Sequence, residues 1–251
     1  MGHQRPTRRD FLTTSAMAGA EMLFVPGLLA GGRASSPRGR QAGHQGWGEV
    51  DAILARIAPP VFPDHLFPVT KYGAVGDGVR DCTAAFRNAI EACAAAGGGR
   101  VLVPEGRFLT GAIHLKSRVE LHVSERATVA FSRDPGHYLP VVFSRWEGVE
   151  LMNYSPFIYA FEQRDVAVTG KGTLDGQASD EHWWPWKISK PESGKPSQLP
   201  ARTRLIEMGA RSVPVGERVF GADSYLRPNF IQPYRCQNVL IEGVTIVNSP
   251  M

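Results

Sequence analysis

Cysteine is scarce in this chain, with three residues among 251: Cys82, Cys93 and Cys236. An odd number excludes a fully paired disulfide framework. Cys82 and Cys93 lie on a predicted helix, about 16 Å apart along its axis, which is too far for them to bridge each other. We therefore expect buried thiols. Four of the histidines are scattered without metal-ligand spacing, so we expect no metal and no cofactor; they are His114, His122, His137 and His182.

A long apolar run is also missing. The most apolar segment, Thr13–Ala30, is interrupted by Glu21 and is too short for a convincing transmembrane helix, so no stable membrane span is expected. The net charge of +4 gives little evidence of a basic surface, because residues 1–40 hold six arginines and two acids and the remaining 211 residues balance. A nucleic-acid partner is therefore disfavoured.

The first residues resemble an export signal. Arg8 and Arg9 follow Thr7 and precede Asp10-Phe11-Leu12, and the apolar segment after them ends in small residues. We interpret residues 1–35 as a twin-arginine signal peptide, which predicts an exported protein, periplasmic or extracellular. The alternative is that two adjacent arginines occur here by chance.

Two helices are predicted before the strands begin. Within residues 36–66, interpreted as a linker and a short helix, apolar residues recur at helical spacing from Val50 to Ile57 until Pro59-Pro60. We expect this helix to dock on the rest of the fold. A second helix starts near Asp81 or Thr83, either of which can cap it, and ends at Gly97-Gly98-Gly99. Its apolar face suits the end of a stack of strands, where it would cover core and unpaired backbone.

From Arg100 the pattern changes to short apolar strands separated by turn residues. Three segments share the form strand, tight turn, strand: VELHVSERATVAF from Val119, VAVTGKGTL from Val166 and VLIEGVTIV from Val239. The first spacing, 47 residues, is near two rungs of a solenoid, and the second, 73 residues, needs an insertion. A β-sandwich is the alternative, but one helix followed by irregularly spaced couplets favours the solenoid.

The predicted insertion spans residues 179–225, with a possible short helix near Leu205–Met208. Aromatic rings on such loops bind sugars well, so Trp183 or Trp184 is a candidate wall of a sugar subsite. Arg218 and Arg227 are candidates to bind a ligand carboxylate through the guanidinium fork. The alternatives are that the tryptophans anchor the loop and that the arginines make structural ion pairs or backbone contacts.

Several motifs follow one another in the order typical of one protein family. They are YGAVGDGVRDCTAAF from Tyr72, GGGRVLVPEGRFLTGAIHLKSRVELHV from Gly97, VAVTGKGTLDGQ from Val166, Trp183-Trp184, and LRPNFIQPYRCQNVLIEGVTIVNSPM from Leu226. In this the chain resembles the amino-terminal portion of glycoside hydrolase family 28, the polygalacturonase-like enzymes. The resemblance implies an all-β fold, a right-handed parallel β-helix with an amino-terminal capping helix. Residues 67–251 would form its first rungs, truncated at the carboxyl terminus.

The same resemblance implies an inverting hydrolase of pectic, galacturonate-containing polysaccharide. The family's catalytic motifs, an Asn-Thr-Asp-like segment, an Asp-Asp pair, a Gly-His-Gly-like histidine and an Arg-Ile-Lys-like pair, do not occur between Met1 and Met251. We therefore assign no catalytic residue here. Asp175 is the tempting substitute, but it belongs to an early rung and lacks a second acid nearby. The alternatives are a non-catalytic β-helix module that binds polysaccharide and a pectate-lyase-like protein.

Overall fold

The computed structural model describes residues 48–187 and 195–251. The predicted export signal, with Arg8 and Arg9, lies outside them. Ile53–Met251 form one compact unit. Within the described residues, no helix is both long and apolar enough to cross a membrane.

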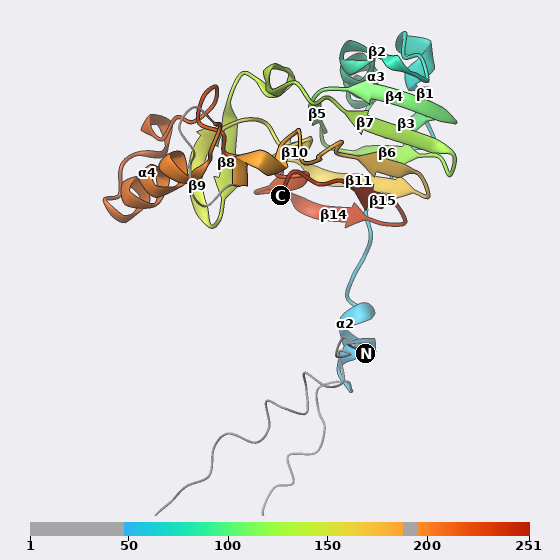
Figure 1. Cartoon of the computed structure of the whole chain (residues 1–251). Helices are drawn as coiled ribbons and strands as arrows, with labels where there is room; N and C mark the ends of the chain where they lie inside the picture. The colour runs from blue at the N-terminus through green and yellow to red at the C-terminus, as the bar shows by residue number, and fades with distance from the viewer. Residues whose placement is uncertain (1–47, 188–194) are drawn as a thin grey trace, which may run out of the picture. The chain divides into compact units, whose positions relative to one another are not determined.

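Three parallel sheets build the compact unit (Figure 1). Sheet A contains β1 (Leu66–Pro68), β3 (Gly99–Val103), β6 (Val119–Val123), β11 (Arg164–Gly170) and β14 (Gln237–Ile241). Sheet B contains β2 (Asp77–Asp81), β4 (Gly106–Thr110), β7 (Ala127–Phe131), β12 (Thr173–Asp175) and β15 (Thr245–Val247), and sheet C contains β5 (Ile113–His114), β10 (Ile158–Phe161) and β13 (Ile231–Tyr234). The chain passes from C to A to B in each full rung, which confirms the expected parallel β-helix.

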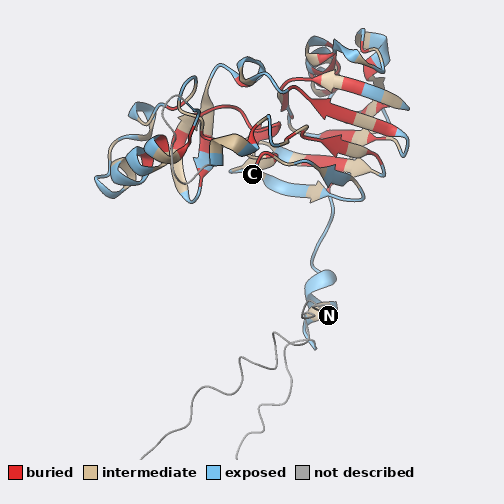
Figure 2. Cartoon of the chain, in the orientation of Figure 1, coloured by how far each residue is buried: buried red, intermediate tan, exposed pale blue. Residues whose placement is uncertain are grey.

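The register between paired strands places apolar side chains of successive rungs directly above one another. In sheet A, Phe67 pairs with Val101, which pairs with Leu121, then Val168 and Ile241. Every second residue of a strand points to the same face, so each strand supplies the core with one row and the surface with the next. Figure 2 shows the middle strands as largely buried with bands of intermediate exposure, whereas β14 is mostly exposed.

The spacing between couplets proved misleading. β11 pairs directly with β6, Ala167 with Glu120, so the 47 residues from Val119 to Val166 make one rung and not two. The extra length is an antiparallel hairpin of β8 (Val142–Trp146) and β9 (Val149–Asn153), which the sequence analysis did not predict. The 73-residue spacing is also a single rung, because β11 pairs with β14; its insertion was predicted.

Helix α3 (Thr83–Ala95) covers the first rung, as expected (Figure 1). Its buried face comprises Ala85, Phe86, Ala89, Ile90 and Cys93. The capping residue differs from the expectation: Cys82 is the N-cap and has no side-chain cap bond, while the Asp81 carboxylate accepts from the backbone N–H of Thr83 at 2.9 Å. Gly98, with φ of 112°, donates its N–H to the carbonyl of Cys93 and ends the helix. Cys82 and Cys93 are buried and unbridged, as predicted.

The remaining elements are two further helices, of which α4 is the longer, and several short turns. Helix α2 (Val50–Leu54) forms where expected but is shorter, and it has no buried residue, so its docking stays a prediction. Helix α4 (Leu199–Ala210) is longer than the predicted Leu205–Met208. The described residues also form four 3₁₀ turns: η1 (Val69–Tyr72), η2 (Pro135–Tyr138), η3 (Trp184–Lys187) and η4 (Val215–Glu217).

A stack of aromatic rings closes the core beside sheet C. Phe157 lies 4.9 Å from Phe131 and 4.7 Å from Tyr138, ring centroid to ring centroid, in stacked geometry. Trp183 packs against the edges of Phe157 and Tyr138. These rings join the strands of the rung to the long insertion, so the insertion shares the main core.

We predict that Phe157→Ala lowers the free energy of unfolding by about 3–5 kcal/mol, because it removes a fully buried ring and leaves a cavity among four others. Urea unfolding of the full chain measures it. Val79→Ala is the control, since Val79 is 78% exposed and its loss should change stability by less than about 0.5 kcal/mol. Equal effects of the two substitutions would contradict the assignment of Phe157 to the core.

Candidate functional site

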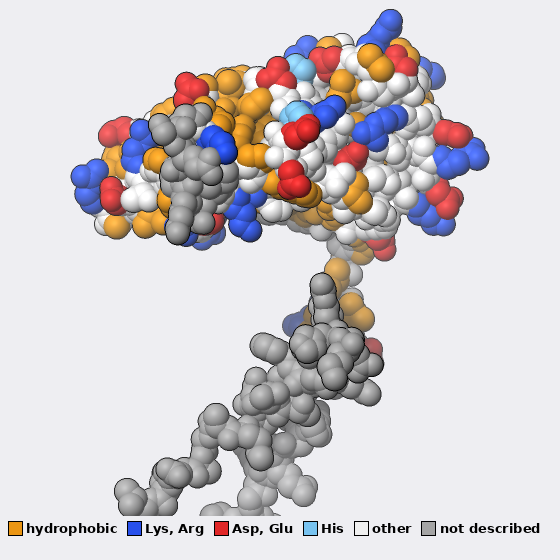
Figure 3. Space-filling model, in the orientation of Figure 1, with side chains coloured by type: hydrophobic (Ala, Val, Ile, Leu, Met, Phe, Trp, Pro, Cys, Tyr) orange, Lys and Arg blue, Asp and Glu red, His pale blue; other side chains and the backbone are white. Residues whose placement is uncertain are grey.

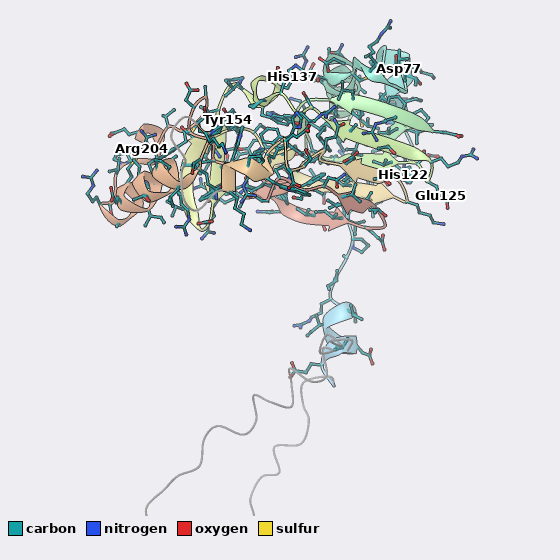
Figure 4. The ribbon with its side chains drawn as sticks, in the orientation of Figure 1. Asp77, His122, Glu125, His137, Tyr154 and Arg204 are labelled. Atoms are coloured by element: carbon teal, nitrogen blue, oxygen red, sulfur yellow. The ribbon has the colours of Figure 1, made fainter. Side chains whose placement is uncertain are left out.

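Two long segments leave the β-helix at the same corner, between sheet B and sheet C. Residues 132–157 connect β7 to β10, and residues 176–230 connect β12 to β13. They pack on each other through a second apolar cluster that includes Trp146, Leu151, Leu205 and Phe220. Figure 4 places Tyr154 and Arg204 on this side of the molecule. The corner therefore carries a surface of loops on a rigid support, which is where binding residues commonly lie.

The two candidate tryptophans have different environments. Trp183 is 1% exposed and sits in the main core, so neither ring face is open to a sugar. It anchors the insertion, which was the alternative interpretation. Trp184 is 41% exposed, and its indole N–H donates to the carbonyl of Ser249 at 2.9 Å. Its ring therefore remains a candidate sugar contact. The hydrogen bond to Ser249 fixes the position of the ring.

Both candidate arginines make backbone contacts. Arg218 donates from Nε to the carbonyl of Val213 and from Nη1 to the carbonyl of Glu150. Arg227 is 7% exposed and donates to the Gln198 amide oxygen at 3.0 Å and the Pro250 carbonyl at 2.6 Å. Burial lowers the pKa of Arg227. These contacts match the structural alternative. Arg218 ties the insertion to β9 through Glu150, and Arg227 ties it to Pro250, which follows β15.

The outward face of sheet C was not anticipated from the sequence. Tyr159 lies in register between His114 and Gln232 on neighbouring strands. The β8–β9 hairpin is fastened over this face: the Tyr159 hydroxyl donates to the carbonyl of Phe143, and the Ser144 hydroxyl donates to the Gln232 amide oxygen at 2.7 Å. The segments FIYAF and FIQPY alternate in polarity, which could have indicated strands with an outward polar face. Nothing in the sequence showed that the β8–β9 hairpin covers this face.

Next to these contacts, aromatic rings and one guanidinium form an aromatic platform, defined by Phe143, Phe161, Tyr234 and Arg235. The Arg235 guanidinium carbon lies 5.0 Å from the Phe143 ring centroid and 5.7 Å from that of Tyr234. Glu150 accepts from the Tyr234 hydroxyl and from Arg235. The Tyr234 hydrogen bond, with Arg235 beside it, holds the pKa of Glu150 below its usual range, and Arg235 also pairs with Glu162 at 3.5 Å.

Asp175 is held as an ion by three donors. Its carboxylate accepts from Arg107 Nη2, from Asn248 Nδ2 and from the backbone N–H of Gln177, each at 2.9 Å. Burial alone would raise the pKa of Asp175, but these donors outweigh it and the pKa is lowered. A carboxylate held in this way is a poor proton donor, which supports a structural role across sheet B.

The structure shows no metal centre in residues 48–187 and 195–251, where no group of three or more His, Cys, Asp or Glu side chains gathers. The histidines are nevertheless less scattered than their sequence positions indicate. His114 and His137 line one groove, whereas His122 lies on the outer face of sheet A, hydrogen-bonded to Thr169.

We predict that Asp175→Asn destabilises the protein by about 1–3 kcal/mol at neutral pH, because a hydrogen-bonded charge is lost. The lowered pKa means that the wild-type contribution is complete above the unfolded value, near 3.8, and disappears as the pH falls through the folded value. The stability gap should therefore narrow below about pH 4. Urea unfolding between pH 2.5 and 7 tests this. Asp180→Asn, at an exposed position, is the control, and a gap that is constant with pH would contradict the ion-pair role.

Comparison with known proteins agrees with this architecture. Residues 66–122 match the family model described as rhamnogalacturonase A/epimerase, pectate lyase-like. The chain is 53% identical to an exopolygalacturonase from Thermotoga maritima, with a TM-score of 0.77 over 80% of this chain and 46% of that one. A family 28 exopolygalacturonase from Yersinia enterocolitica has the same fold, with a TM-score of 0.53 at 21% identity over 75% of this chain and 36% of that one.

Curated relatives show the same likeness. An exo-poly-alpha-D-galacturonosidase of Dickeya chrysanthemi is 30% identical over 201 residues, 72% of this chain and 32% of that protein. A protein of Vitis vinifera named probable polygalacturonase is 28% identical over 200 residues, 73% of this chain and 37% of that protein. The chain thus spans about a third of the length of these relatives. Over the rungs described above, it resembles the polygalacturonase-like proteins of glycoside hydrolase family 28 and shares their parallel β-helix.

Proposed function

We propose that this chain forms the amino-terminal rungs of an exported, polygalacturonase-like glycoside hydrolase that cleaves galacturonate-containing polysaccharide with inversion. The observation that carries the proposal is the 53% identity to the Thermotoga maritima exopolygalacturonase across 80% of the chain. The names of the Dickeya chrysanthemi and Vitis vinifera relatives support the same substrate class. The pectic polysaccharide is the proposed partner.

In the inverting reaction, one carboxylic acid protonates the leaving oxygen while a carboxylate on the opposite face of the sugar activates water. Neither group is assigned to this chain, and Asp175, paired with Arg107, is not a substitute. The proposed contribution of residues 67–251 is positional. Their rungs fix the outward face of sheet C with the aromatic platform next to it, and the long segment between sheets B and C presents Trp184.

We predict that purified 1–251 releases no reducing ends from polygalacturonate, because it lacks the acid and the base. A chimera in which the chain is followed by the remaining carboxyl-terminal part of the Thermotoga maritima exopolygalacturonase should cleave the polymer and release product of inverted anomeric configuration. Reducing-end assays and NMR of the first product measure both. Activity of 1–251 that disappears in Asp175→Asn would overturn the assignment. Binding without cleavage by the chimera would favour the non-catalytic module.

The export route is a separate part of the proposal and rests on Arg8-Arg9 with Phe11-Leu12. We predict that replacing both arginines by lysine traps a reporter fused to residues 1–46 in the cytoplasm, because the twin-arginine route recognises the pair and not the charge. Cell fractionation measures the distribution. Arg38→Lys/Arg40→Lys is the matched control, with the same change downstream of the motif. Unchanged export of the Arg8/Arg9 variant would show that the pair is accidental.

A further inference from the structure

A groove of about 340 Å³ lies between helix α3, strand β5 and the η2 turn. Its floor is apolar and includes Ile90, Ala112 and Ile113. Its rim is polar, and the charged or titratable side chains that line it are Arg87, Glu91, His114, Lys116 and His137. Figure 4 labels His137 on the turn above β5, and Figure 3 shows histidine side chains among basic and acidic ones along this edge. Binding sites for small ligands have this construction, an apolar base with a few convergent polar groups.

The rim has more basic than acidic groups, two cations against one carboxylate. Arg87 and Lys116 form no ion pair with any residue of the described ranges, and Glu91 is the only acid that lines the groove. Some exposed arginines elsewhere are paired, Arg126 with Glu105 and Arg202 with Glu147, whereas Arg118, like Arg87, forms no ion pair within the described residues. Unpaired cations around a concave surface concentrate the positive potential there.

The imidazole of His114 is held in a fixed orientation. Its Nε2 lies 2.9 Å from the Ser155 hydroxyl, and its ring packs against Tyr159 edge to face, with centroids 5.3 Å apart. No hydrogen bond of its Nδ1 occurs within the described residues. Desolvation by the neighbouring groups, with Lys116 as a second cause, lowers the pKa of His114, which favours the neutral ring, a suitable partner for a hydroxyl. The groove therefore combines unpaired cations with an oriented neutral polar group.

We propose that this groove binds an acidic oligosaccharide, with a uronate carboxylate held by Arg87 and Lys116 and sugar hydroxyls directed to His114. Carboxylate recognition fits the guanidinium of Arg87, and the apolar floor fits the C–H face of a pyranose ring. The choice of occupant rests on the proposed function, since galacturonate polymers carry one carboxylate on each sugar.

The test uses the full chain and hexagalacturonate. Isothermal titration at low salt should show binding that weakens about tenfold in Arg87→Gln/Lys116→Gln, because two charge-assisted contacts are lost. Lys71→Gln/Lys171→Gln removes the same charge at exposed positions outside the groove and should stay within about twofold of the wild type. Addition of the ligand should also move the imidazole proton resonances of His114 and His137 but not those of His122.

Three outcomes would overturn the inference. They are no binding of hexagalacturonate, equal loss in the two double variants, and equally tight binding of poly-glutamate, which would show that charge alone is recognised. Its failure is distinguishable from that of the proposed function. If the chimera cleaves the polymer but the two double variants bind hexagalacturonate equally well, only the groove proposal is rejected. If binding depends on the groove but the chimera does not cleave, only the hydrolase proposal is rejected.

Discussion

The in-register stacking of one rung on the next is the constraint on which the other features depend. Each inward side chain packs on the residue at the same position of the neighbouring rungs, as Leu121 does on Val101 and Val168. A shift of one residue would turn a whole strand's apolar row outward, so the register is strongly specified. Parallel backbone hydrogen bonds then repeat along the stack without a further requirement on sequence. The side chains that point outward from the strands are not constrained in this way, and Tyr159 and Gln232 are among them.

Register also determines where the insertions can lie. The turns from sheet C to sheet A and from A to B are short, whereas the long segments leave between B and C. Successive rungs stack directly, so segments that leave at one corner become neighbours although they are far apart in sequence. This explains why Trp146 of the hairpin and Leu226 of the later insertion share one apolar cluster. The segments that leave at this corner also supply Trp184 and, through His137 and Leu139, part of the groove beside α3.

Much of the fold was predictable because its signals are local. The couplets appear as β6–β7, β11–β12 and β14–β15, and the apolar face of α3 with its closing glycines gave the capping helix. The number of rungs was not predictable from spacing, since 47 residues fit two plain rungs or one rung with a hairpin equally well. The role of Trp183 depended on packing with Phe157 and Tyr138, rings that the chain supplies from another segment. The groove was missed for the same reason, because Arg87, His114 and His137 meet only through the fold.

The antiparallel hairpin and the α4 segment have a consequence for how such a protein diversifies. Both begin and end on strands whose pairing is set by the stack, so their ends are fixed at a constant separation. Lengthening a loop between fixed ends costs little, about 0.6 kcal/mol for each doubling. Changes of length and composition at this corner are therefore nearly uncoupled from the core. Related chains can therefore differ in the surfaces they present at this corner while keeping one scaffold.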